Sequence, residues 1–228
     1  MNVATWNVEH RIGPAALLFD ETAESLRARN AAFPSDDNHR LLRVLRILEP
    51  TIVLGSSQSA EDIIQPLSVP VVRRRSGGGA VWLDPAAVVW FDIIIGRSDR
   101  LWSDDVGQAM WWVGEAFAQS LRALGDDLAM VHQSAMIHHP LERKVCWTGL
   151  GPGEVTHRAS GTKSVGIAQR RMRNAALFQV GVLLSPCQHL LADPMGLDPS
   201  VILVGERGIG VDPQALIESA IGVLQRIT

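Results

Sequence analysis

Two short stretches of this sequence hold residues whose types and spacing could do chemistry. The first, RRRSGGGAVWLD at residues 73–84, places three glycines directly after three arginines and a serine. The second, RASGTKSVGIAQRRMR at residues 158–173, has five basic residues and no carboxylate. Because clustered cations and glycine-rich backbone both favour negatively charged ligands, each stretch is a candidate for binding an anion.

Lys163 stands out in the second stretch, because only two of the 21 basic residues in the chain are lysines. A lysine carries a compact ammonium with rotatable donors, whereas an arginine carries a planar guanidinium whose donors have fixed directions. The ammonium suits a site where a carboxylate attacks a phosphate and charge passes between several oxygens. A surface lysine is usually only a solvated charge, but this chain uses arginine for nearly all its cations. The composition therefore favours a functional lysine.

The glycines at residues 77–79 follow a predicted strand and would let the backbone approach a ligand closely. A simple hairpin turn is the alternative interpretation of SGGG. The stretch does not match a P-loop, because no Gly-Lys-Ser/Thr ends it, and its glycine spacing differs from that of dinucleotide-binding loops. Strand alternation predicts that Arg73 and Arg75 share one face and that Arg74 faces the other way.

Together the two stretches resemble the lipoate-protein ligase A family, which is related to the biotin-protein ligases. The first family motif is matched by Arg73, Arg74, Gly77, Gly78, Gly79, Ala80 and Val81. The second, a lysine followed by small residues and often A-Q-R-R, is matched by KSVGIAQRR with Lys163 as its lysine. The segment TIVLGSSQ resembles the V-x-G-x-x-Q segment of the family and places Gly55 and Gln58. The resemblance spans roughly residues 10 to 225.

This resemblance implies a reaction in two steps. Lipoate or octanoate attacks the α-phosphate of ATP to give an acyl-adenylate, and a lysine of an acceptor protein then takes the acyl group. Lys163 would be the catalytic residue, with Mg²⁺ at the phosphates and Glu154 as its candidate ligand. The acyl-adenylate would be bound by Arg74, Ser76, Gly77, Gly78, Gly79, Ala80, Gly55, Gln58, Gly166 and Ala168. The implied acceptors are lipoyl domains of 2-oxoacid dehydrogenase E2 subunits or the H protein of glycine cleavage.

The sequence departs from the family pattern at three places that concern the nucleotide and the metal. Leu83 stands where many ligases have a histidine, and the segment FQVG at residues 178–181 stands where many have a histidine pair before a glycine. Gly153 and Glu154 replace the Asn-Asp that is often found upstream of the lysine.

Cys146 gives a rival interpretation. Octanoyltransferases of the same superfamily move an acyl chain from acyl carrier protein through a cysteine thioester, without ATP. Cys146 lies upstream of both Glu154 and Lys163, as in some of these enzymes. The alternative is that Cys146 is a small buried hydrophobe.

A third hypothesis, prompted by the missing histidines, is a non-catalytic paralogue that binds an acyl group or acyl-adenylate. The adjacent pair His138-His139 lacks a third ligand at useful spacing for a metal, and no Gly-x-Ser-x-Gly motif suggests a serine hydrolase.

Helices at both ends of the chain must position these stretches around a strand-rich middle. Residues 15–32 have an amphipathic pattern, and a closing helix is predicted after Asp212-Pro213 with Leu216, Ile217, Ala220, Ile221 and Leu224 facing inward. A third helix is predicted at 103–125 with Ser103 as its N-cap. Strands are predicted at TIVLG, VPVVRRR, GAVWL, VVWFDIII, LERKVCW, KSVGIAQ and ALFQVGVLL. Leu41, Leu42, Leu45 and Leu48 have helical spacing, but the type of their segment stays open. The expected fold is a mixed α/β (α+β) domain, with a largely antiparallel sheet flanked by helices, similar to the biotin/lipoyl-protein ligase catalytic domain.

Length and composition fit one catalytic domain over residues 1–228. The net charge of −3 gives no general attraction to nucleic acid or to an anionic membrane. Two cysteines make no disulfide framework, and the N-terminus does not resemble a signal peptide, so we expect a cytoplasmic protein. Many two-domain ligases continue into a C-terminal accessory domain. Here we expect either a separate accessory polypeptide or a single domain that adenylates more slowly.

Overall fold

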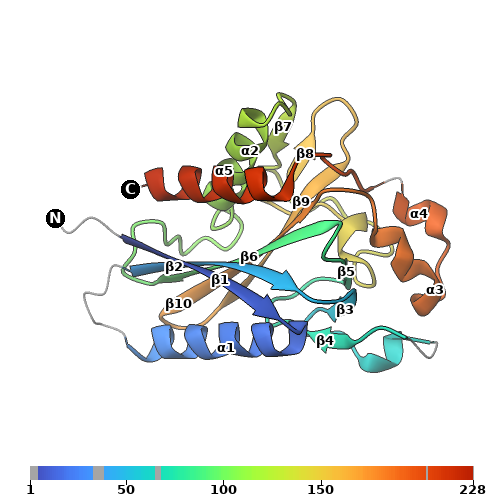
Figure 1. Ribbon diagram of the computed structural model, residues 1–228, viewed down its shortest axis with the longest axis horizontal. Coiled ribbons are helices and arrows are strands. Elements are labelled where there is room, and N and C mark those ends of the chain that lie inside the picture. Colours follow the sequence, from blue (N-terminus) through green and yellow to red (C-terminus); the bar gives the residue numbers. More distant parts are fainter. Residues whose placement is uncertain (1–4, 33–38, 65–67, 204, 228) are drawn as a thin grey trace.

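The computed structural model describes residues 5–32, 39–64, 68–203 and 205–227. Its strands are β1 (Thr5–Gly13), β2 (His39–Ile47), β3 (Thr51–Leu54), β4 (Val71–Arg73), β5 (Val81–Leu83), β6 (Val88–Gly96), β7 (Ala129–Val131), β8 (Val155–His157), β9 (Lys163–Arg171) and β10 (Ala175–Leu183). They form a seven-stranded sheet in the order β1-β2-β6-β10-β9-β8-β7 and a three-stranded sheet in the order β4-β3-β5. Figure 1 shows both sheets.

The larger sheet is mixed and mostly antiparallel, as expected from the sequence. Only β1 and β2 run parallel in it. In the smaller sheet, β3 pairs in parallel with β4 and antiparallel with β5. The two central strands β6 and β10 are buried on both faces, which explains why their sequences are nearly continuous apolar runs.

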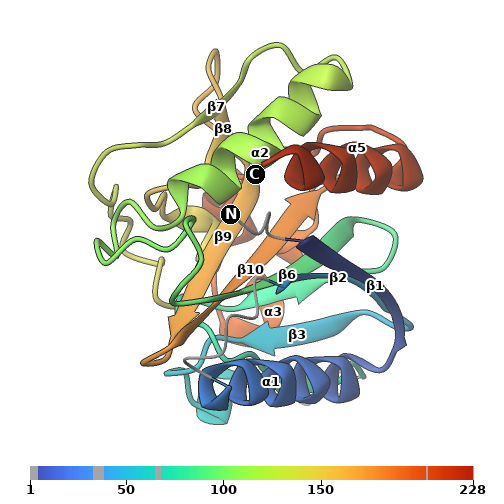
Figure 2. The same cartoon turned by 90° about the vertical axis from the view of Figure 1, so that its left-hand side faces the viewer.

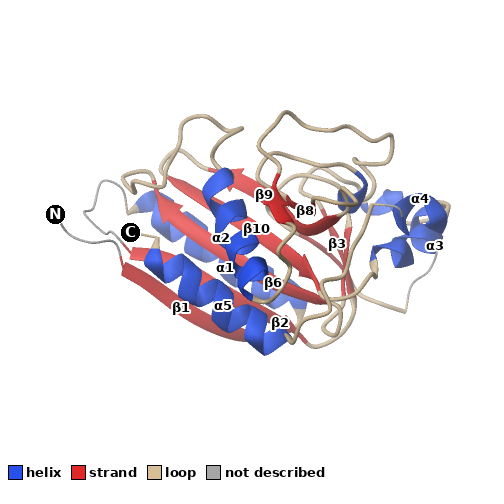
Figure 3. Ribbon diagram, turned by 90° about the horizontal axis from the view of Figure 1, so that it is seen from above, coloured by secondary structure: helices blue, strands red, loops and turns tan. Residues whose placement is uncertain are grey.

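Helices cover both faces of the larger sheet. The helix α1 (Ala15–Ala31) packs on one face, and α2 (Trp111–Ala123) and α5 (Pro213–Arg226) pack together on the other, as Figures 1 and 3 show. Shorter helices complete the described chain: η1 (Ala60–Asp62), η2 (Cys146–Thr148), η3 (Gln188–Leu191), α3 (Ala192–Met195) and α4 (Pro199–Leu203). No helix among the described residues has the length and apolar character needed to cross a membrane.

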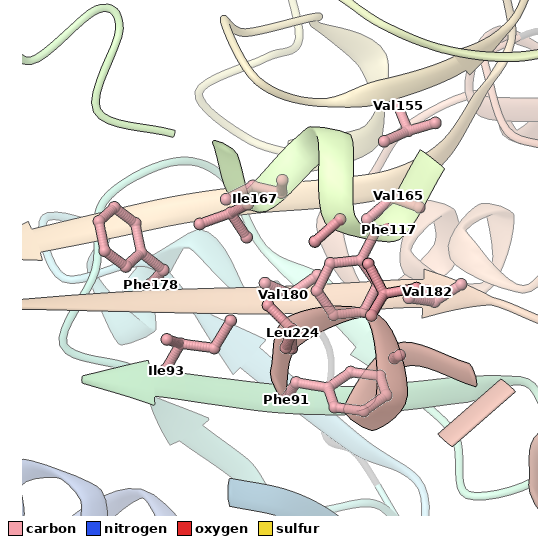
Figure 4. Packing of buried hydrophobic residues seen from close by; sticks show 14 of the residues in the cluster. Phe91, Ile93, Phe117, Val155, Val165, Ile167, Phe178, Val180, Val182 and Leu224 are labelled. Atoms are coloured by element: carbon pink, nitrogen blue, oxygen red, sulfur yellow. The ribbon is translucent and has the colours of Figure 1, made fainter. Parts of the chain in front are cut away.

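Alternation along β6 and β10 divides the core into two layers. Phe91, Ile93, Phe178 and Val180 point toward α2 and α5, where they meet Phe117, as Figure 4 shows. The alternate positions face α1 and the smaller sheet, because successive side chains of a strand point to opposite faces. The layer beneath α2 and α5 is therefore apolar, while the other layer receives the smaller sheet and its glycine-rich loop.

Two expectations about elements need correction, and one segment whose type was left open is now assigned. The helix α2 begins at Trp111 rather than near Ser103, and Val106, which lies inside the predicted helix, is 56% exposed. Polar groups hold residues 103–108 in turns instead, because the Asp105 carboxylate accepts from the N–H groups of Gly107 and Gln108. The segment LERKVCW is a turn followed by η2, with one bridge from Val145 to Ala80, and is not a strand. The segment with helical leucine spacing is the strand β2.

Candidate functional site

The glycine-rich loop between β4 and β5, defined here as residues 76–79, is held from inside by Arg74. This side chain is only 1% exposed, and its guanidinium donates to the carbonyl oxygens of Gly77 at 2.7 Å and Gly79 at 2.9 Å. Burial lowers the pKa of Arg74 from its usual value, and the neighbouring Cys146 thiol opposes that shift. Arg73 and Arg75 are exposed, so the three arginines alternate as the strand pattern predicts.

The glycine loop lies directly against the end of β3. A Cβ on Gly55 would lie 1.9 Å from the carbonyl oxygen of Gly78, so no other residue fits there without moving backbone. Gln58 closes this corner, because its Oε1 accepts from the N–H of Gly55 at 2.9 Å and its Nε2 donates to the Lys144 carbonyl at 3.1 Å. Gly78 has φ of 94°, a conformation that favours glycine. Gly55 and Gln58 therefore shape the loop from behind.

Lys163 is the first residue of β9 and is 3% exposed. Its ammonium donates to the carbonyl oxygens of Cys146 at 2.8 Å and Gly149 at 2.7 Å. It also meets both oxygens of the Glu154 carboxylate, at 3.1 and 3.0 Å. The ammonium lies 5.3 Å from the ring centroid of Trp147. A buried charge of this kind needs such partners, and here every partner is an oxygen or a π face.

Glu154 is likewise buried and fully engaged. Besides the ammonium of Lys163, it accepts the N–H of Gly151 at 2.7 Å and the N–H of Ile167 at 3.2 Å. Both carboxylate oxygens therefore already have donors, and they do not present a metal-binding face in this arrangement. Among the described residues, no group of three or more His, Cys, Asp or Glu side chains has a geometry that could hold a metal. The assignment of Glu154 as a metal ligand stays a prediction.

A cavity of about 230 Å³, called here the loop cavity, lies between the glycine loop, the segment after η2 and β9. Its walls include Cys146, Gly149, Glu154 and Ala168. The first three of these residues supply the partners of the Lys163 ammonium, so that charge lies immediately behind the cavity wall. Two larger cavities, of about 290 and 760 Å³, lie along β1 and are lined by no residue of either motif.

Trp147 fills the space on the other side of Cys146. Gly166 and Gly181 are register partners on β9 and β10, and the indole Cη2 lies 2.8 and 3.2 Å from where their Cβ atoms would be. The cavity that remains here, called the sheet cavity, has only about 10 Å³, enough for about one water molecule. Gly166 therefore makes room for an indole ring.

Cys146 lines both cavities. It is half-buried, and its Sγ lies 3.5 Å from where a Cβ of Gly78 would be. Its backbone is fixed to the loop, since the Ala80 N–H donates to the Lys144 carbonyl at 2.7 Å and the Cys146 N–H donates to the Ala80 carbonyl at 2.9 Å. The thiol thus stands at the junction of the glycine loop and the Lys163 environment.

The structure therefore gathers the residues singled out from the sequence into one region. Arg74, residues 76–80, Cys146, Glu154, Lys163 and Ala168 meet around the loop cavity or directly behind its wall. Gln179 and Trp147 were not among the residues predicted from the sequence to belong to the site. A glutamine inside the otherwise apolar strand ALFQVGVLL is the signal that could have identified Gln179, since a buried amide in a central strand must find polar partners.

Comparison with known proteins points to one family. The model of the lipoyl protein ligase A/B catalytic domain matches residues 23–195. No curated protein sequence matches the chain.

Solved structures of lipoate-protein ligases have the same fold as this chain. A T. acidophilum lipoate protein ligase with bound lipoic acid superposes with a TM-score of 0.71 at 19% identity, covering 96% of this chain and 84% of that one. A lipoate-protein ligase A bound with ATP gives 0.72 at 19% identity, with coverage of 96% and 84%. A bi-partite lipoate protein ligase from Thermoplasma acidophilum, studied with its E2 lipoyl domain, gives 0.71 at 16% identity, with coverage of 97% and 83%.

Proposed function

Because the chain belongs to the lipoyl protein ligase A/B catalytic domain family, we propose that it transfers a lipoyl or octanoyl group to the lysine side chain of an acceptor lipoyl domain. The observation that carries this proposal is the buried Lys163 ammonium immediately behind the wall of the loop cavity. A charge whose hydrogen-bond partners there are all oxygens can exchange those oxygens for the carboxylate and phosphate oxygens of a ligand.

We propose that ATP activates the acid. The carboxylate oxygen of lipoate or octanoate attacks the α-phosphorus, a C–O–P linkage forms, and pyrophosphate leaves with the electrons of the broken P–O bond. The resemblance to a ligase structure that contains ATP supports this route. Mg²⁺ commonly accompanies ATP through the phosphate oxygens and one or two carboxylates. The engaged oxygens of Glu154 do not fit that role as they stand, so no step here depends on the metal.

Lys163 would act in both steps through its mobility. In the free protein Glu154 balances its charge, and two carbonyl oxygens fix its direction. When the ligand binds, the ammonium would turn from Glu154 toward the oxygens on which negative charge develops. In the second step the neutral acceptor amine attacks the acyl carbon, an amide bond forms, AMP leaves with the electron pair of the C–O bond, and the amine loses a proton.

The first experiment measures ATP–pyrophosphate exchange with lipoate and with octanoate, followed by acyl transfer to a purified lipoyl domain. Exchange that depends on the acid is the expected result. Binding of a non-hydrolysable lipoyl-adenylate analogue without exchange or transfer would instead identify a non-catalytic binding protein.

The position of Cys146 favours one second candidate, a thioester transferase. Its thiol lines both cavities and lies beside Arg74 and the glycine loop. In that reaction the Cys146 thiolate attacks the thioester carbonyl of octanoyl acyl carrier protein, a new thioester forms, and the carrier thiol leaves. The acceptor lysine then attacks this thioester and regenerates the thiol.

Replacing Cys146 by serine separates the two candidates. A ligase should keep most of its activity, since the change removes only packing, whereas a transferase should lose turnover because its nucleophile is gone. Intact-mass analysis with octanoyl carrier protein and no ATP provides a direct check. An octanoyl adduct on Cys146 that passes to a lipoyl domain would replace the ATP-dependent proposal.

A further inference from the structure

A row of polar side chains crosses the larger sheet and ends beneath the glycine loop. Strand register pairs Glu9 with Arg43, Arg43 with Asp92, Asp92 with Gln179, and Gln179 with Ala168. The row therefore spans β1, β2, β6, β10 and β9, whose order can be followed in Figures 1 and 2. Register partners project on the same face of a sheet, so these side chains share the layer that receives α1 and the glycine loop.

Hydrogen bonds make the middle of this row continuous. Gln179 Nε2 donates to Asp92 Oδ1 at 3.1 Å, and the Trp90 indole N–H donates to the same oxygen at 2.9 Å. The other Asp92 oxygen accepts from the Thr22 hydroxyl of α1 at 2.6 Å. Arg43 in turn donates to that hydroxyl at 3.1 Å. The Asp92 carboxyl thus joins two strands and a helix.

The row is also bonded to the glycine loop. Gln179 Oε1 accepts from the hydroxyl of Ser76 at 2.8 Å and from its N–H at 3.3 Å. The Ser76 hydroxyl accepts from Arg74 Nε at 3.1 Å, and the guanidinium of Arg74 holds the carbonyl oxygens of the loop. One unbroken path of hydrogen bonds therefore leads from the centre of the sheet to the glycines.

The chemistry of the row fixes the orientation of the Gln179 amide. The Thr22 hydroxyl and the Trp90 indole N–H both donate to Asp92, and at the other end the Ser76 N–H needs an acceptor, so the amide turns its NH₂ toward Asp92. The amide oxygen is then left facing Ser76, which is the only orientation that satisfies both ends. Gln179 is 2% exposed, and a buried amide costs stability unless it is bonded in this way. An apolar residue would fill the same position without that requirement, but it would offer the loop nothing to bond.

We propose that Gln179 is a positioning residue, which acts through Ser76 and Arg74 to hold the glycine loop in its ligand-binding shape. Asp92 is the residue that sets its amide orientation. This inference rests on the proposed function only for the identity of the ligand that the loop binds; the attachment of the loop is a separate property that can be measured without any ligand.

The chain contains a matched control for this proposal. Gln188 is also a fully buried glutamine bonded at both ends, since its Oε1 accepts from the Trp82 N–H at 2.9 Å and its Nε2 donates to the Trp82 carbonyl at 2.8 Å. It lines neither the loop cavity nor the sheet cavity. Gln188→Leu therefore removes comparable hydrogen bonds from Trp82 in β5, the strand that follows the glycine loop, and none from the loop residues themselves.

The first test is hydrogen exchange in the absence of ligand. In Gln179→Leu, amides in the peptide spanning residues 75–80 should exchange at least about tenfold faster than in the wild type, because a lost buried hydrogen bond opens the loop. Gln188→Leu should leave that peptide within about twofold of the wild type. Equal exchange of this peptide in the two variants overturns the proposal. If Gln179→Leu does not fold, Ser76→Ala provides the same test from the loop side, with the same expected and opposing results.

The second test uses a non-hydrolysable lipoyl-adenylate analogue as the probe. Gln179→Leu and Ser76→Ala should each weaken binding by about tenfold, and the double variant should be little worse than either, because both changes break one path. Additive losses would show that Gln179 does not act through Ser76 and would overturn the proposal. A wild-type protein that fails to bind the probe and fails to transfer acyl groups contradicts the proposed function, while the exchange experiment still decides the role of Gln179.

Discussion

At the scale of single residues, Lys163 is defined by the oxygens around its ammonium. Two carbonyls and one carboxylate converge on a single nitrogen from different directions. A planar guanidinium, whose donors lie in one fork, does not match that arrangement. The scarcity of lysine in this chain thus has a structural counterpart, since the one buried lysine occupies a site that arginine geometry does not fit.

The first prediction follows from this geometry. Lys163→Ala should reduce acyl transfer by about 10²–10³, and Lys163→Arg should not restore it, because the compact ammonium donor is lost in both variants. Transfer to a lipoyl domain, measured by mass shift, is the readout. Lys144 is exposed and is the other lysine of the chain, so Lys144→Ala and Lys144→Arg are matched controls that should keep their activity. Near wild-type transfer by Lys163→Arg would remove Lys163 from the catalytic role.

The two cysteines should differ sharply in reactivity. Burial raises the pKa of Cys187 to about 12, so its thiol stays protonated, and therefore a poor nucleophile, at every pH well below that value. Cys146 is half-buried and lines the loop cavity. Iodoacetamide near neutral pH should therefore label Cys146 at least about tenfold faster than Cys187 in the folded protein, as followed by peptide mass spectrometry. Faster labelling of Cys187 would contradict the burial described here.

At the scale of elements, the glycine loop combines one tightly packed contact with one open position. A Cβ on Gly55 would collide with the Gly78 carbonyl, whereas a Cβ on Gly77 would meet no atom within 4 Å. Gly55→Ala should therefore destabilise the protein by about 1–3 kcal/mol, because backbone must move. Gly77→Ala should keep the melting temperature but weaken binding of a lipoyl-adenylate analogue, because its methyl group would enter the ligand space. Thermal unfolding and titration separate the two effects, and a lowered melting temperature for Gly77→Ala alone would contradict this assignment.

Elements whose pattern repeats along their whole length were predictable from the sequence. The segments at β6, β9 and β10 and the helices α1 and α5 lie where their apolar periodicity predicts. Prediction failed where local polar contacts or single long-range contacts decide the structure. The turn at Asp105 places the start of α2 several residues later than predicted. Backbone hydrogen bonds to Ala80, which is distant in the sequence, fix the segment around Cys146. The strand β1 was also missed, because its exposed edge position leaves it without a clear apolar pattern.

The candidate site was likewise predictable from the sequence only in part. The glycine loop and Lys163 were predicted from residue type and spacing. Consecutive glycines indicate close backbone approach, and a lysine is unusual in a chain whose other cations are almost all arginines. The bonding of Lys163 to Glu154, and of Gln179 to Ser76, depends on strand register and on the meeting of two sheets. No spacing within the sequence encodes those contacts.

At the scale of the whole molecule, the site is assembled from segments far apart in the chain. The smaller sheet brings the glycine loop, η2 brings Cys146, and β9 brings Lys163 to one region over the same face of the larger sheet. Because every one of these segments lies within the described part of the chain, we expect the proposed acyl transfer to proceed on residues 1–228 alone. In the proposed reaction adenylation would make a greater demand, since two substrates would have to be oriented at once and the Lys163 ammonium would have to turn from Glu154.

The last prediction separates these two halves of the reaction. Residues 1–228 alone should transfer the acyl group from preformed lipoyl-adenylate to a lipoyl domain. ATP-dependent activation of free lipoate by the same preparation should be slower, or should require an added accessory protein. The two rates are compared by quantifying the lipoylated acceptor by mass spectrometry, with Lys163→Ala as the inactive control and Lys144→Ala as the active one. Because the adenylate bypasses the demanding first step, a folded wild-type protein that transfers nothing from it would contradict ligase chemistry altogether. Equally fast reactions from lipoate with ATP and from the adenylate would show that this chain completes both steps unaided.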